Sequence, residues 1–129
     1  MPSTLISIRR HWPAVQRRGL IEAVHKALVE ALKIPADDRC VRLQQLPAED
    51  FDAKPGQSRN FTLVEIDLFS GRTLAAKKAL YQAIVANLGK LGVEPGDVKI
   101  VLREIPAENW GIRGGVPASE VNLGYKVEV

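Results

Sequence analysis

The sequence predicts an α+β protein: two consecutive β-α-β units that share one four-stranded mixed sheet, with two helices on one face. Two observations support this fold class. Apolar residues alternate with polar ones in four short runs, which predicts four strands. Between the first and second runs, and again between the third and fourth, apolar residues recur at spacings of three and four, which predicts a helix. The second half of the chain also repeats the first without a gap, at a constant offset of 59 positions, so that Pro47 matches Pro106.

The first unit begins with an apolar run over residues 3–8, which predicts a strand. Pro13 suits the first position of a helix, where a missing N–H costs nothing, and the apolar spacing predicts a helix over 15–32. Residues 34–35 (Ile-Pro) end that helix, and 40–46 alternate as a second strand. Residues 47–60 carry two prolines and a glycine and are expected to form a loop.

The second unit repeats this order with a strand over 61–67, a helix over 72–91 and a strand over 98–105. The two repeats span about 2–51 and 61–110 of a single domain, and residues 111–129 are expected to add a short hairpin or strand that serves trimer contacts. The equivalent pairs include Asp38 and Asp97, Val41 and Ile100, Leu43 and Leu102, Val29 and Leu88, and Phe51 and Trp110.

Each β-α-β crossover is expected to be right-handed, which places both helices on one face of the sheet. The other face would then expose several hundred Å² of apolar surface, which soluble monomers avoid. The segment 111–129 is too short to cover that face. The architecture therefore predicts self-association.

Composition excludes several classes of protein. The net charge is +3, aromatic residues make up 5% of the chain, and no run of Lys and Arg exceeds a pair, so a nucleic-acid surface is not expected. No signal peptide or membrane-spanning run is present, and the chain is interpreted as cytoplasmic. The single cysteine, Cys40, lies in an alternating run and is expected to be a buried, inert thiol.

Pro2 is the first candidate for chemistry. If Met1 is removed, the chain begins with a secondary amine at the start of a buried strand, where loss of solvation lowers the pKa of the amine. Such an amine can act as a general base near neutral pH. The alternative is that proline is merely a common second residue.

Four features in this order resemble the tautomerase superfamily, which includes oxalocrotonate tautomerase, malonate semialdehyde decarboxylase and macrophage migration inhibitory factor. They are an amino-terminal Pro2, the tandem β-α-β repeat, residues 70–73 (Ser-Gly-Arg-Thr) opening a helix, and residues 109–112 (Asn-Trp-Gly-Ile) before two glycines. Residues 34–39 are most similar to the long-chain, decarboxylase-like group. The resemblance implies the tautomerase fold, a homotrimer, and one Pro2 site per chain, because Phe61 replaces proline in the second half.

The resemblance also implies roles for individual residues. Arg72 would hold a substrate carboxylate, and Asp38 matches an acidic residue of the decarboxylase, although its repeat partner Asp97 fits a plain structural use. Ser70 stands where the decarboxylase has a second arginine, which argues against that specific activity. The remaining candidates are Trp110 as a pocket wall, Arg113 as a replacement anion contact or an exposed side chain, and Arg10 near the position of a tautomerase arginine.

The leading hypothesis is a cofactor-independent keto–enol tautomerase of small 2-oxo or enol carboxylates, without a metal, nucleic-acid or membrane partner. The first alternative is a decarboxylase or hydratase of a 3-oxo acid with a cationic Pro2. The second is a non-catalytic trimeric binding module, for which mass spectrometry would find Met1 retained or Pro2 acetylated. The sequence leaves open whether Pro2 acts as a base or as an acid.

Overall fold

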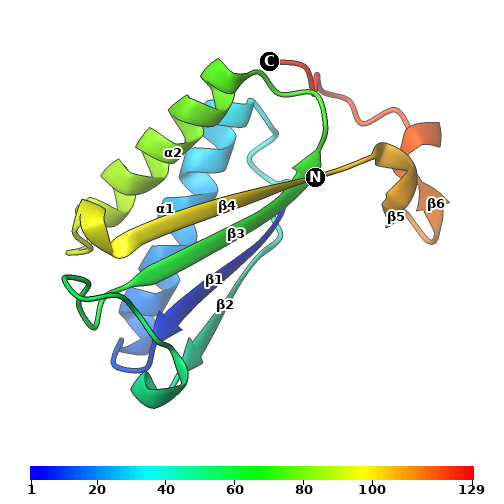
Figure 1. Ribbon diagram of the computed structural model, residues 1–129. Helices are drawn as coiled ribbons and strands as arrows, with labels where there is room; N and C mark the ends of the chain where they lie inside the picture. Colours follow the sequence, from blue (N-terminus) through cyan, green and yellow to red (C-terminus); the bar gives the residue numbers. More distant parts are fainter.

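A single four-stranded mixed sheet in the order β2-β1-β3-β4 forms the centre of the molecule (Figure 1). The computed structural model describes all 129 residues. Strand β1 runs parallel to β2 and antiparallel to β3, and β3 runs parallel to β4. Both helices lie on one face of the sheet, as predicted. The elements are β1 (Ser3–Arg9), α1 (Ala14–Leu32), β2 (Val41–Leu46), β3 (Thr62–Phe69), α2 (Leu74–Gly89) and β4 (Val98–Ile105).

The start of α2 differs from the prediction in a way that matters for the site. The helix begins at Leu74 because the Thr73 side chain caps it, accepting a hydrogen bond from the Ala76 N–H at 3.1 Å. Arg72 therefore lies in the turn that precedes the helix and not within it.

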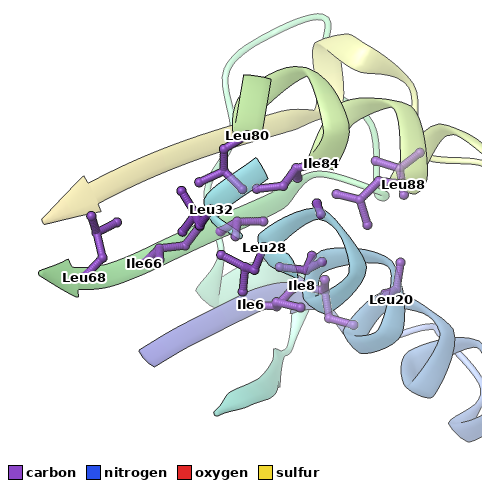
Figure 2. Packing of buried hydrophobic residues seen from close by; sticks show 14 of the residues in the cluster. Ile6, Ile8, Leu20, Leu28, Leu32, Ile66, Leu68, Leu80, Ile84 and Leu88 are labelled. Carbon is purple, nitrogen blue, oxygen red and sulfur yellow. The ribbon is translucent and has the colours of Figure 1, made fainter. Parts of the chain in front are cut away.

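The core fills the space between the two helices and the sheet (Figure 2). Alternate residues of β1 and β3 point toward the helices, which present their own apolar stripes at spacings of three and four. Burying each such Leu or Ile side chain stabilises the fold by about 1.5–3 kcal/mol. The largest fully buried side chains include Ile6, Ile8, Leu20, Leu28, Leu32, Ile66, Leu68, Leu80, Ile84 and Leu88.

The face of the sheet away from the helices is less apolar than expected. Arg103 on β4 pairs with Asp67 and Glu65 on β3, with N–O distances of 2.7 and 3.0 Å. On the other strand pair, Gln44 donates to the Ser7 hydroxyl at 2.9 Å. Charged and polar side chains therefore interrupt the apolar surface expected on this face, because period-two alternation places them opposite the core positions.

The expectation of a buried Cys40 was also wrong, since the cysteine is exposed. Strand β2 is an edge strand and begins only at Val41, so Cys40 lies just before it and has a strand neighbour, β1, on one side only. Its Sγ is 3.6 Å from the Ser3 hydroxyl oxygen. None of the helices is both long and apolar enough to cross a membrane.

The C-terminal segment forms the expected hairpin and then returns to the start of α2 (Figure 1). Strands β5 (Gly111–Ile112) and β6 (Val116–Pro117) pair antiparallel. The last residue is held at the helix start, because the Thr73 N–H and hydroxyl donate to the Val129 carbonyl at 3.1 and 2.9 Å. This segment therefore covers the turn that carries Arg72.

Candidate active site

The amino terminus lies at the start of β1, one of the two central strands of the sheet. Pro2 is buried and Met1 is exposed. The Met1 ammonium group donates a hydrogen bond to the Tyr125 hydroxyl and lies 3.7 Å from Oδ2 of Asp38. Removal of Met1 would leave the buried Pro2 nitrogen as the terminal amine, one residue closer to the core.

The surroundings of the Met1 amine lower its pKa. Burial is the largest cause, because it disfavours the charged form, and the guanidinium of Arg72 acts in the same direction. The carboxylate of Asp38 opposes both by stabilising the ammonium form. The net effect on the Met1 amine is a pKa below the ordinary value of an α-amino group, which favours a neutral amine.

Asp38 is carried by a turn that follows α1. The turn closes with a hydrogen bond from the Asp38 N–H to the Pro35 carbonyl at 3.1 Å. His25, buried on α1, contacts the Ala36 carbonyl through Nε2 at 2.8 Å, so this histidine packs against the turn and holds it. The Asp38 side chain is 10% exposed and faces the amino terminus.

The repeat partner of Asp38 has a different environment. Asp97 accepts hydrogen bonds from the N–H and the hydroxyl of Ser58, at 2.7 and 2.6 Å. Its carboxylate is thus used to hold a loop, whereas Oδ2 of Asp38 has no hydrogen-bond partner in the chain. The two aspartates share a place in the repeat, but only Asp38 faces an amine.

Arg72 is buried, with 5% of its surface exposed. Its Nη1 donates to the Phe69 carbonyl at 3.2 Å, while Nε and Nη2 have no acceptor. Burial lowers the pKa of Arg72, and the nearby Tyr125, Glu128 and Asp38 oppose that shift. Two donors on one edge of a buried guanidinium match the two oxygens of a carboxylate.

Tyr125 belongs to this group of residues, although it is not among the site residues predicted from the sequence. Burial and the Asp38 carboxylate raise the pKa of its hydroxyl, so the phenol stays protonated at neutral pH. The only signal in the sequence was an aromatic residue within an otherwise irregular C-terminal segment. Nothing in the local pattern indicates that this segment reaches the amino terminus.

A cavity of about 180 Å³ opens beside the amine. Arg113 lines it and has a left-handed backbone with φ of 48°, a conformation that non-glycine residues seldom adopt. No group of three or more His, Cys, Asp and Glu side chains is placed to hold a metal ion. The lining residues are Met1, Pro35, Asp38, Ile112, Arg113, Leu123 and Tyr125.

The other predicted residues take different positions. Trp110 packs its ring against Phe69, with ring centroids 4.9 Å apart, and its Nε1 donates to the Ile105 carbonyl at 3.2 Å. Ser70 is exposed in the turn between Phe69 and Arg72. Arg10 is exposed beyond the far end of β1, roughly 26 Å from Pro2 along the strand, so one chain does not bring it to the amine.

Comparisons with known proteins find similarity to tautomerases. Two family models, both described as tautomerase enzyme, match residues 38–113 and 7–55. The chain is 38% identical over 58 residues, or 44% of its length, to a probable tautomerase of Ralstonia nicotianae, of which it covers 81%. It has the same identity over the same length to the 2-hydroxymuconate tautomerase of Pseudomonas putida, of which it covers 90%.

Two solved structures extend the similarity to nearly the whole chain. The FG41 malonate semialdehyde decarboxylase, in its form inhibited by 3-bromopropiolate, is 31% identical with a TM-score of 0.83, covering 89% of this chain and 92% of that chain. The symmetric trimer of a fused 4-OT is 28% identical with a TM-score of 0.81, covering 90% and 95%. The resemblance read from the sequence is confirmed, and the chain belongs to the tautomerase superfamily of enzymes.

Proposed function

We propose that this chain is a cofactor-independent keto–enol tautomerase of small 2-oxo or enol carboxylates. The observation that carries the proposal is the proximity of the amino terminus, where the pKa of the Met1 amine is lowered, to a buried arginine whose Nε and Nη2 have no partner in the chain. The amine can move a proton, and the arginine can hold the carboxylate of the molecule that gives or receives it.

In the proposed reaction, Met1 is removed and the neutral Pro2 amine takes the proton from the enol hydroxyl. The resulting ammonium group then gives a proton to the double-bond carbon next to the one that bears the oxygen. This completes the conversion of enol to ketone without net consumption of a proton. Asp38 stabilises the transient ammonium, and the protonated Tyr125 hydroxyl orients the amine by accepting its hydrogen bond.

Arg72 holds the substrate carboxylate through Nε and Nη2 in this proposal. Arg113, which lines the cavity, gives a second positive charge, and Ser70 in the turn before Arg72 is a hydrogen-bonding group. Trp110, fixed against Phe69, provides an apolar wall near the start of β1. These groups would bind a small anion with a short apolar tail.

We further propose that the chain assembles as a homotrimer. The support is the 28% identical fused 4-OT, whose structure is that of a symmetric trimer. In such an assembly Arg10 would act in the site of a neighbouring copy, because it cannot reach Pro2 of its own chain. Part of the segment 111–129 would contact the neighbouring copy, although residues 127–129 pack at the start of α2.

The direct test is the enol-to-keto conversion of phenylpyruvate by the wild-type protein and by the Pro2→Ala variant. The variant keeps an amine terminus but replaces the secondary amine by a more flexible primary one. A fall in kcat for Pro2→Ala supports the proposal, provided that thermal unfolding is unchanged. Equal rates in the two proteins would refute a catalytic role for Pro2.

A decarboxylase or hydratase of a 3-oxo acid is the second candidate. It is favoured by Asp38, which lies 3.7 Å from the Met1 amine and opposes the lowering of its pKa, and by the 31% identity to a malonate semialdehyde decarboxylase. That reaction would use a cationic Pro2. An NMR titration of the Pro2 nitrogen separates the two candidates, because a pKa of about 6–7 leaves a neutral base at pH 7, whereas one above about 8 leaves a cation.

A further inference from the structure

A second and larger cavity lies at the opposite end of the sheet from the amine. Its volume is about 620 Å³, which is within the range of about 300–1,000 Å³ typical of small-molecule sites. It lies about 23 Å from Pro2, because Phe61 stands across from the last residue of β1. The lining residues are Phe51, Asp52, Ala53, Lys54, Gln57, Phe61, Leu63, Pro95, Gly96, Val98 and Lys99.

The repeat makes this cavity the counterpart of the amine cavity. At the offset of 59 positions, Phe61 takes the place of Pro2, and residues 94–97 take the place of 35–38. Ala53, which lines the second cavity, corresponds to Ile112, which lines the first. The second cavity therefore lies at the equivalent place in the repeat, although it is larger than the first. It has no amine, since residue 61 is in the middle of the chain.

Hydrogen bonds hold the walls of the second cavity in place. Arg9 donates to the Phe51 carbonyl from Nε and Nη2, at 3.0 and 2.7 Å, and so fixes the loop to the end of β1. Ser58 fixes the same loop to Asp97, and the Gln57 amide nitrogen reaches the Gly96 carbonyl at 3.4 Å. The cavity is thus preformed, as ligand sites usually are.

The lining of the cavity combines aromatic surface with positive charge. The rings of Phe51 and Phe61 lie 5.4 Å apart, and Leu63 and Val98 add apolar surface. Lys54 and Lys99 are charged and make no ion pair in the chain, whereas Asp52 contributes one negative charge. The net positive charge favours an anion, and the aromatic rings favour an apolar body on that anion.

We propose that this cavity binds an aromatic monocarboxylate without transforming it. The ring of the ligand would pack against Phe61 and Phe51, and its carboxylate would accept hydrogen bonds from Lys99 and Lys54. The inference goes beyond the tautomerase reaction, because it assigns the inactive half of the repeat a binding role of its own. This binding role does not depend on whether Pro2 is catalytic.

The test is a titration of the protein, in its native assembly, with phenylacetate and with its neutral amide. Methyl groups labelled with ¹³C in Leu, Val and Ile distinguish the two cavities, because Leu63 and Val98 line the second and Ile112 and Leu123 line the first. We expect phenylacetate to shift the Leu63 and Val98 signals saturably, and phenylacetamide to bind about tenfold more weakly, since it forms no charge-assisted hydrogen bond.

Three variants decide the origin of any signal. Lys99→Gln should weaken phenylacetate binding at Leu63 and Val98 about tenfold, without changing the tautomerase rate. Pro2→Ala should leave binding at these two residues unchanged. The proposal is overturned if phenylacetate gives no saturable shift at Leu63 and Val98, as when a second copy of the chain fills the cavity. Shifts that are insensitive to both Lys99→Gln and Lys54→Gln would overturn it as well.

Discussion

Replacement of Arg72 by methionine separates a substrate-binding arginine from a structural one. Within the chain, the side chain donates only to the Phe69 carbonyl, a contact with a net value of about 1 kcal/mol. Its loss is partly offset, because the variant no longer buries a charge. The free energy of unfolding should therefore change by no more than about 1 kcal/mol.

The expected effect on catalysis is much larger. Two charge-assisted hydrogen bonds from Nε and Nη2 to a carboxylate contribute about 1.5–3 kcal/mol each, or at least about 3 kcal/mol together. Since 1.4 kcal/mol corresponds to a factor of ten, kcat/KM for phenylpyruvate should fall by more than about a hundredfold in Arg72→Met. The measurements are steady-state kinetics of tautomerisation and urea unfolding of the same preparations.

Arg9 provides a matched control. This arginine also binds backbone carbonyls, but Nε and Nη2 both donate to Phe51 and Nη1 donates to Ser58 at 3.4 Å, so its hydrogen bonds are used within the chain. Arg9→Met should lower the free energy of unfolding by about 2 kcal/mol and leave kcat/KM unchanged. The reasoning is refuted if Arg72→Met behaves in the same way, with lost stability and an unaltered kcat/KM.

Three further predictions concern the charges around the amine. Asp38→Asn should lower the pKa of the Pro2 amine, measured by NMR titration, because the carboxylate that stabilises its cation is lost. Asp97→Asn should instead lower the free energy of unfolding in urea by about 2 kcal/mol, because the hydrogen bonds to Ser58 are weakened. The tautomerase rate should rise with pH through the pKa of the Pro2 amine, which we expect to be lowered as that of the Met1 amine is, because the neutral base accumulates above that pKa. A rate that falls over the same interval would contradict a basic Pro2. Arg113→Gly should keep or raise the melting temperature, since glycine relieves a left-handed backbone that costs about 1 kcal/mol. The same variant should raise KM for phenylpyruvate, and an unchanged KM would show that Arg113 does not bind the substrate.

The fold could be predicted because its determinants are local. Alternation marks strands and spacings of three and four mark helices, and the repeat gave each element a second, independent observation. The strand predicted over 98–105 coincides with β4, and the helix predicted over 15–32 begins one residue earlier. Both ends of α2 were missed by two residues, and the error at the start arose because the cap at Thr73 depends on one hydrogen bond.

The errors arose where exposure depends on neighbouring elements. Cys40 belongs to an alternating run, but only the strand order shows that this run ends at the sheet edge. Likewise, the pairing of Arg103 with Asp67 across two strands makes the open sheet face partly polar, and that pairing requires the register of β3 and β4.

The sequence by itself determined the two β-α-β units, because periodicity is a property of a linear chain. It also determined the difference between Pro2 and Phe61 at equivalent positions of the repeat, and the family, which follows from residue-level similarity. The tertiary structure decided which groups meet at the amine. Asp38 arrives on a turn after α1, Arg72 on the turn before α2, and Tyr125 on the C-terminal segment. Their proximity follows from sheet order and from the return of the C-terminal segment to Thr73, and contacts over such sequence separations leave no periodic signal in the chain.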